Sequence, residues 1–183
     1  MFIILNFVFL LTNQYFILMK TSNRLFQLLV AALFFTVSAT YSQEIHYVTI
    51  HFNTAEITSQ NELEMCYFSS QSPDMEPITS EGNIEDFNIT VAAGDTIIWR
   101  GVSTSNPDSD IVNVSSINYH GGDNVFDTNI LNGNNEEPEE VIGVVKPDTN
   151  GQVEKYTIKF TVLNNGERRG GTFKVDPKIT VKP

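Results

Sequence analysis

Apolar and polar residues alternate along most of the chain beyond residue 44, a pattern typical of β-strands that bury one face. In the run at 45–53, Val48, Ile50 and Phe52 fall on one face and mostly polar residues on the other. Similar runs recur at 87–91, 97–99, 111–117, 140–146, 156–162 and 173–181. Turn-forming residues separate these runs, and helical spacing of apolar residues is almost absent. The pattern predicts an all-β fold, an antiparallel β-sandwich of seven to eight strands.

The last two runs predict a hairpin with an interrupted return strand. Between them, Asn164-Asn165-Gly166 supplies residues that tolerate positive φ, so the chain is expected to reverse there. Asp176-Pro177 interrupts the return strand, and a proline cannot donate to a β-ladder. We therefore expect an edge strand or a bulge at this point.

The beginning of the chain has the composition of an export signal. After Met19, the positive residues Lys20 and Arg24 precede an apolar run at 25–37, and small residues follow as far as Ser42. We expect cleavage close to Ser42, so that residues 1–42 form a signal peptide and are removed.

The stretch at 1–18 is also apolar, but no positive charge precedes it. We expect it to be a mis-called upstream extension, with Met19 the true start. The alternative is one long membrane anchor, but polar and charged residues interrupt it, whereas a spanning helix needs about 20 apolar residues. The expected mature protein is one sandwich domain at 43–183, exported to the periplasm or secreted by a bacterium.

Charge limits the partners of this domain. Residues 43–183 hold all 22 acidic residues and nine of the 11 basic ones, which gives a net charge of −13. Such a surface repels phosphate backbones and anionic lipid, so we expect neither nucleic-acid binding nor membrane insertion after signal cleavage. The sequence leaves the ligand and the oligomeric state open.

The charge is also unevenly distributed. Between residues 43 and 145 there are 18 acids and a single base, Arg100, whereas residues 146–183 hold eight bases and four acids. We expect Arg100 to pair with neighbouring carboxylates, and the basic C-terminal strands to be held by acidic neighbours.

A corner sequence gives the first resemblance. In 87–100, two short alternating runs flank Ala92-Ala93-Gly94-Asp95, and the second run ends near Trp99. This arrangement resembles the corner at which cupredoxin-like β-sandwiches turn one strand into the next. The expected connectivity is therefore cupredoxin-like or immunoglobulin-like.

The resemblance does not extend to copper. A type 1 copper site needs two histidines, a cysteine thiolate and usually a weak axial methionine. No His, Cys or Met follows His120, and the single cysteine, Cys66, comes before the corner. We expect no copper electron transfer and no cofactor, and we interpret Cys66 as a buried, inert thiol.

A second resemblance covers about 87–181. The motifs are Gly94-Asp95-x-Ile97-x-Trp99-Arg100, then Tyr156-x-Ile158-x-Phe160 and Asp176-Pro177-x-Ile179. Together they resemble the bacterial inclusion-body protein family of the PixA and AidA type. The resemblance implies a β-sandwich without an established catalytic site, and it adds no active residues.

The functional prediction is a non-catalytic binding or interaction module. No Gly-rich phosphate loop or His-Glu-x-x-His occurs, and no Ser/His/Asp trio is suggested by local sequence. Function on a β-sandwich usually lies on end loops. In the loop expected around 120–140, the candidate ligand-binding residues are Tyr119, His120, Asp123 and Phe126. An aromatic ring beside polar side chains suits a glycan or another envelope component.

Two metal hypotheses stay open beside this prediction. The runner-up function is a metal-dependent activity using His120, in a flexible loop, with Asp123 or Asp127. Asp108 and Asp110 offer oxygen ligands at alternating positions and are weak calcium candidates, although calcium prefers 6–8 oxygens. Whether the protein is an enzyme is left undecided, with the balance against it.

Overall fold

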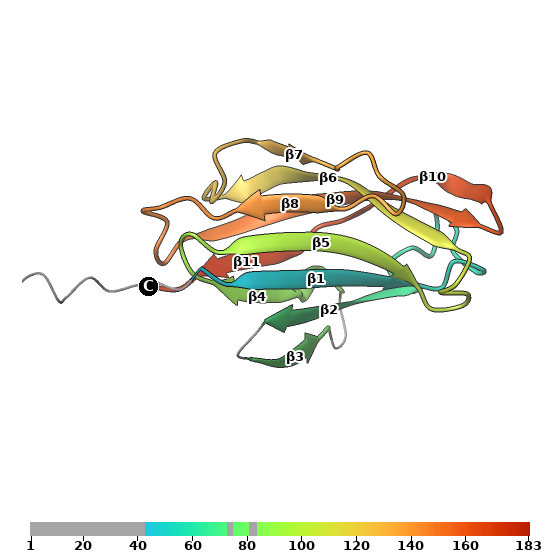
Figure 1. Cartoon of the computed structure of the whole chain (residues 1–183), viewed down its shortest axis with the longest axis horizontal. Coiled ribbons are helices and arrows are strands. Elements are labelled where there is room, and N and C mark those ends of the chain that lie inside the picture. Colours follow the sequence, from blue (N-terminus) through green and yellow to red (C-terminus); the bar gives the residue numbers. More distant parts are fainter. Residues whose placement is uncertain (1–42, 73–74, 81–83) are drawn as a thin grey trace, which may run out of the picture. The chain divides into compact units, whose positions relative to one another are not determined.

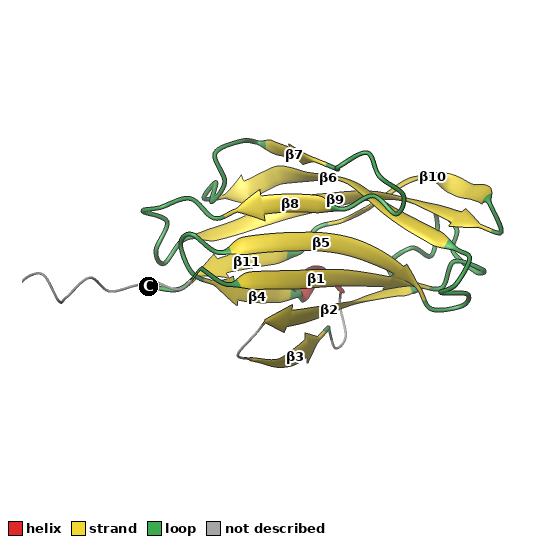
Figure 2. Ribbon diagram, viewed as in Figure 1, coloured by secondary structure: helices red, strands yellow, loops and turns green. Residues whose placement is uncertain are grey.

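The computed structural model describes residues 43–72, 75–80 and 84–183. Residues 43–183 form one compact unit. Its described part consists of β-strands and loops, with a single 3-10 turn, η1, at Ile84–Asp86 (Figure 2). The expected signal peptide at 1–42 lies outside the described residues, so its cleavage and the export of the protein stay predictions.

Sheet A has five strands in the order β3-β2-β1-β5-β8 (Figure 1). They are β3 (Met75–Thr79), β2 (Cys66–Ser72), β1 (Ile45–Phe52), β5 (Thr96–Ser103) and β8 (Val141–Val144). Strands β1 and β5 run parallel, and the other neighbours in this sheet are antiparallel.

Sheet B has the order β4-β11-β9-β6-β7, and β10 also pairs with β9. Its strands are β4 (Asn88–Val91), β11 (Lys178–Val181), β9 (Val153–Asn164), β6 (Ile111–Gly122), β7 (Ile130–Asn132) and β10 (Glu167–Val175). Strands β4 and β11 run parallel, whereas β9 is antiparallel to each of its neighbours.

The predicted all-β sandwich is confirmed, with two corrections. The described residues form eleven strands rather than seven or eight, because β2, β3 and β7 lie outside the predicted runs and the interrupted return strand counts as two, β10 and β11. The sheets are mixed rather than antiparallel. A parallel pair needs a crossover connection, and for β1 and β5 the chain from β2 to β4 supplies it.

The predicted corner joins the two sheets. It carries the chain from β4 in sheet B to β5 in sheet A, and Gly94 provides the positive φ of 92°. The Asp95 carboxylate accepts hydrogen bonds from the backbone N–H of Ala92 at 2.7 Å and of Glu44 at 3.0 Å. These bonds fix the beginning of β5 beside the beginning of β1.

The core lies between the sheets. Trp99 is 1% exposed, and its indole N–H donates to the Tyr156 hydroxyl at 3.2 Å, so its polar atom is satisfied without water. The rings of Phe52 and Phe160 lie 4.3 Å apart between their centres, which joins β1 to β9 across the core.

The final hairpin follows the sequence prediction. Asn165 and Gly166 have φ of 53° and 78° at the turn between β9 and β10. At Pro177, whose carbonyl accepts the Tyr156 N–H at 3.1 Å, the return strand passes from β10 into β11. Strand β11 lies between β9 and β4, so this part of the return strand is not an edge, and Asp176-Pro177 separates β10 from β11, which both pair with β9.

Candidate functional site

The predicted ligand residues begin at the end of β6 rather than in a loop. His120, expected in a flexible loop, belongs to this strand. Its Nδ1 lies 3.1 Å from the Thr157 hydroxyl and 3.3 Å from the Asp176 carboxylate, on the outer face of sheet B. Tyr119 pairs with the buried Tyr156 and donates its hydroxyl to a backbone oxygen, so the neighbouring side chains Tyr119 and His120 lie on opposite faces.

The other two predicted residues are also separated. Phe126 is 3% exposed and meets Trp99 edge-on with ring centres 5.7 Å apart, so it belongs to the core. Asp123 is exposed and accepts the Val153 N–H at 3.3 Å. The structure therefore does not assemble Tyr119, His120, Asp123 and Phe126 on one surface, and Phe126 is not accessible to a ligand.

The calcium candidates have different surroundings. Asp108 is exposed, whereas Asp110 is buried. The Asp110 carboxylate accepts hydrogen bonds from the Thr54 hydroxyl at 2.5 Å, the Asn164 amide at 2.7 Å and the Asn165 N–H at 2.9 Å. These bonds, the Thr54 bond above all, lower the pKa of Asp110 although burial opposes them. The protein's own donors thus occupy the carboxylate, which anchors the β9–β10 turn.

A buried string of hydrogen bonds that local sequence does not suggest links Ser72, His46 and Asp95. The Ser72 hydroxyl lies 2.5 Å from His46 Nδ1, and His46 Nε2 lies 2.8 Å from the Asp95 carboxylate. Burial opposes ionisation of Asp95, but its backbone and His46 hydrogen bonds outweigh burial and lower its pKa. In the neutral tautomer of His46 that carries its proton on Nε2, the ring donates to Asp95 and Nδ1 accepts the Ser72 hydroxyl proton.

The order Ser-His-Asp resembles a catalytic triad, but the two ring nitrogens have exchanged partners. In a triad Nε2 faces the serine and Nδ1 the aspartate, whereas here Nδ1 faces Ser72 and Nε2 faces Asp95. His46 is 2% exposed and Ser72 is 9% exposed, so little of either side chain reaches solvent. The string ties β1, β2 and the corner together.

His46 also belongs to a group of three side chains that could together bind a metal ion. It is the one such group within the described residues. Ligand atoms of Glu44, His46 and Asp95 lie within 4.8 Å of one another. A cation there would have to replace the hydrogen bond from His46 to Asp95. His120, Asp123 and Asp127 form no such group among the described residues.

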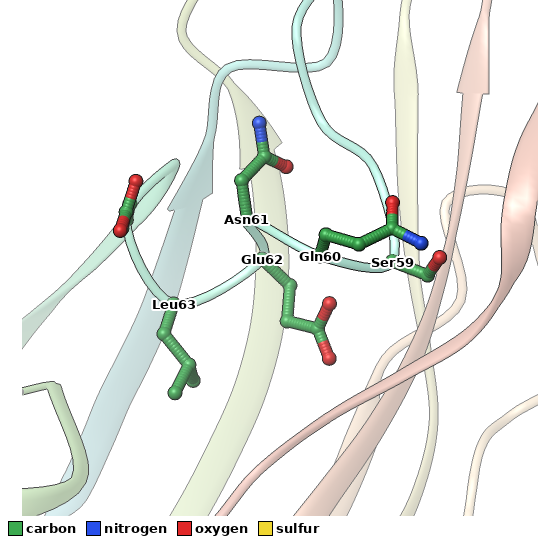
Figure 3. Close-up of a pocket in the computed structure, with 6 residues that line it drawn as sticks. Ser59, Gln60, Asn61, Glu62 and Leu63 are labelled. Carbon is green, nitrogen blue, oxygen red and sulfur yellow. The ribbon is translucent and has the colours of Figure 1, made fainter.

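One hollow lies in the loop between β1 and β2. It measures about 240 Å³ and is bordered by residues 59–64. Figure 3 shows that the side chains of Asn61, Glu62 and Leu63 point in different directions rather than toward a common centre. This hollow therefore offers no convergent chemistry. Beside it, the Cys66 thiol donates to the Glu62 carbonyl, and burial raises its pKa to about 12, which makes the thiol inert.

A second hollow lies beside the outer face of sheet A. It measures about 350 Å³ and is bordered by Ile45, Tyr47, Gln71, Ser72 and Arg100. The Arg100 guanidinium carbon lies 4.8 Å from the centre of the Tyr47 ring. Its Nε donates to the hydroxyl of Thr49 at 3.0 Å, and its two terminal nitrogens have no hydrogen-bond partner among the described residues.

The expected pairing of Arg100 with carboxylates is wrong for the described residues, where it forms no ion pair. His51, on the same face, stacks on Tyr67 with ring centres 4.4 Å apart. Burial, and then the charge of Arg100, lower the pKa of His51. At neutral pH His51 is therefore uncharged, and Arg100 is the basic side chain of this face.

Apolar side chains continue the same surface. Ile45, Ile142 and Val144 are 46%, 52% and 55% exposed. Val144 pairs with Thr96, which also pairs with Ile45, so these side chains share the outer face of sheet A. The face thus combines exposed apolar surface with a guanidinium that has no carboxylate partner among the described residues.

Comparisons with known proteins bear on the fold. No family model and no curated protein matches the chain. Among solved structures, the chain is similar to the inclusion body protein PixA from Burkholderia cenocepacia, with a TM-score of 0.57 and 13% sequence identity over 80% of this chain and 99% of that one. At this identity the similarity shows the fold alone, and it agrees with the PixA-type resemblance of the sequence motifs. Cupredoxin-like connectivity stays a prediction.

No helix in the described part of the chain is long and apolar enough to cross a membrane.

Proposed function

We propose that this protein is an exported, non-catalytic binding module and that it holds its ligand on the outer face of sheet A, around Arg100. The observation that supports this proposal is the state of the Arg100 guanidinium. It borders a hollow in the most acidic part of the chain, yet within the described residues it contacts a ring and a hydroxyl rather than a carboxylate. The export of the protein rests on the composition of residues 1–42.

The groups around the hollow indicate the chemistry of the ligand. A guanidinium binds a carboxylate through two parallel hydrogen bonds, and the terminal nitrogens of Arg100, which have no hydrogen-bond partner among the described residues, can supply them. The Gln71 amide can bond hydroxyl groups, and the exposed Ile45 can cover the apolar face of a sugar ring. These features favour a short carboxylate-bearing glycan, such as a uronic-acid oligosaccharide of a cell envelope.

The test compares charged and neutral glycans. Isothermal titration calorimetry of the protein with oligogalacturonate and with dextran should show binding of the first only. Arg100→Gln should weaken that binding at least about tenfold, because a charge-assisted bidentate contact is lost. Arg168→Gln is the matched control, since Arg168 is exposed on β10. Equal affinity for both glycans, or no effect of Arg100→Gln with the fold intact by circular dichroism, would contradict the proposal.

The proposal that the protein is non-catalytic needs a separate test. The Ser72, His46 and Asp95 string has the hydrogen-bond order of a hydrolase, so a fluorophosphonate probe will show whether the serine is nucleophilic. Because Ser72 is buried, we expect no labelling of the native protein. Labelling that Ser72→Ala removes would make the protein a hydrolase instead.

A further inference from the structure

Four lysines on the outer face of sheet B form two like-charged pairs. Lys159 of β9 lies opposite Lys174 of β10, and Lys155 of β9 lies opposite Lys178 of β11. Directly opposed side chains have Cβ atoms about 4.5–5.5 Å apart, so like charges there repel each other. We call these four residues the lysine strip.

Carboxylates within the described part of the molecule do little to neutralise the strip. Lys178 has an ion pair with the exposed Asp86 at 3.8 Å, and the other three lysines have none among the described residues. Asp176 follows β10 on the same face, but its two oxygens bind Thr157 at 2.6 Å and His120 at 3.3 Å. The expectation that acidic neighbours hold the basic strands therefore fails within the described residues, except at Lys178.

An acidic segment without ion pairs to the described residues lies beside the same sheet. The loop between β7 and β8 contains Glu136, Glu137, Glu139 and Glu140, here called the acidic loop. The N–H of Glu139 donates to the Asn113 side chain at 2.7 Å, and its carbonyl accepts the Val114 N–H at 2.9 Å. Asn113 alternates with the buried Val112 and Val114, so its side chain lies on the outer face of sheet B. No glutamate of the loop forms an ion pair with a described residue.

We propose that the lysine strip binds the acidic loop of a second copy of this chain. The two segments match in charge and number, four ammonium groups against four carboxylates, and in the described part of one molecule they do not pair with each other. Association removes the repulsion within both segments at once. A long polyanion fits less well, because it would also meet the acidic surface around the strip, whereas a second copy presents its carboxylates locally.

The association depends on salt in a specific way. Residues 43–183 of each copy carry a net charge of −13, so two copies repel at long range, but this repulsion is screened over about 8 Å at 0.15 M salt. Contacts between the strip and the loop act at shorter range and weaken only at higher salt. We therefore expect association at 0.15 M NaCl and dissociation near 1 M NaCl.

Sedimentation velocity on the protein as isolated from its host tests the proposal. Reversing the strip with Lys159→Glu and Lys174→Glu, or the loop with Glu136→Lys and Glu137→Lys, should each lower the association constant at least about tenfold. An equimolar mixture of the two variants should associate again, because each then offers the complement of the other. Arg168→Glu with Lys182→Glu changes the net charge by the same amount as the strip reversal, at positions beyond the two ends of the strip, and should leave association unchanged.

Three results would overturn the proposal. One is a monomer at 0.15 M NaCl up to millimolar protein, and another is association that both reversals leave intact. The third is a mixture of the two variants that stays monomeric. Tight, strip-dependent binding of polyglutamate or heparin by a protein that stays monomeric would assign the strip to an anionic polymer instead.

Discussion

Glu154 is an ionisable side chain in the interior, 1% exposed, and its carboxylate accepts the Val125 N–H at 2.6 Å. Burial raises its pKa to about 7, although the Val125 bond and the charge of Lys146 oppose the rise. The folded state binds this proton more tightly than the unfolded state, so the stability it contributes is complete below about pH 4.5 and declines until about pH 7.

The first prediction follows from that linkage. Glu154→Gln keeps an oxygen for the Val125 N–H and removes the titration. At pH 5 the variant should unfold near the wild-type midpoint, and at pH 8 it should be more stable by up to about 3 kcal/mol. Urea unfolding at both pH values measures the difference. The exposed Glu167→Gln is the control, and an equal effect at pH 5 and pH 8 would show that Glu154 does not titrate in this range.

The second prediction concerns Asp110, which holds the β9–β10 turn against Thr54. Asp110→Ala leaves several donors without their acceptor and should destabilise the fold by about 1–3 kcal/mol at pH 7. Because the pKa of Asp110 is lowered, its contribution is present above about pH 4 and is lost below it. The loss measured by urea unfolding should therefore shrink toward pH 3. Asp108→Ala should have little effect at either pH, since Asp108 is exposed.

Gly101 sets the approach of two strands from different sheets. A Cβ at this position would lie 2.6 Å from the Val112 carbonyl oxygen and would also overlap the Val112 side chain. The third prediction is that Gly101→Ala pushes β5 away from β6 and costs about 1–3 kcal/mol of stability. Thermal unfolding with Gly171→Ala as control tests it, because a Cβ at Gly171 meets nothing within 4 Å. Equal midpoints for the two variants would show that the strands can shift without cost.

Local sequence patterns predicted most of the strands and turns. They did not predict which strands pair when those strands are distant in sequence. Residues 92–95 and 164–166 specify turns by their own φ preferences, so the corner and the last hairpin were predictable. The parallel pairing of β1 with β5 was not, because it joins strands about 50 residues apart and depends on the intervening crossover.

The candidate sites show the same division. Arg100 was recognisable as an isolated base, but its contact with Tyr47 depends on the β1–β5 register. The link from His46 to Asp95 depends on the same pairing. Phe126 was assigned to a surface because its neighbours are polar, yet the segment returns to the core and packs this ring on Trp99. Alternation of apolar and polar residues identifies the buried face of a strand, but it does not identify which residues of a loop are buried.

Acidic and basic residues occupy different parts of the sequence. Most of the acids lie before residue 146, and most of the bases lie at residues 146–183. Such a separation would stabilise a monomer if the two groups met in ion pairs. Among the described residues, however, Lys178 to Asp86 is the one pair between a lysine or arginine and a carboxylate, and it is exposed. Exposed pairs contribute about 0–1 kcal/mol, so attraction between surface charges adds little to the stability of the monomer.

The last prediction therefore reverses the expectation from sequence, in which salt would weaken a network of ion pairs. Residues 43–183 carry a net charge of −13, and the lysine strip adds local repulsion, so screening should favour the folded monomer. Raising NaCl from 0.02 to 0.2 M shortens the screening length from about 20 to about 7 Å and should raise the midpoint of thermal unfolding. The protein must be dilute enough that sedimentation shows a monomer at every salt concentration, which separates this effect from association. Choline chloride at the same ionic strength should give the same rise, because screening depends on charge rather than on the identity of the cation. A midpoint that falls as NaCl increases would mean that attractive pairs beyond those of the described residues hold the two charged regions together.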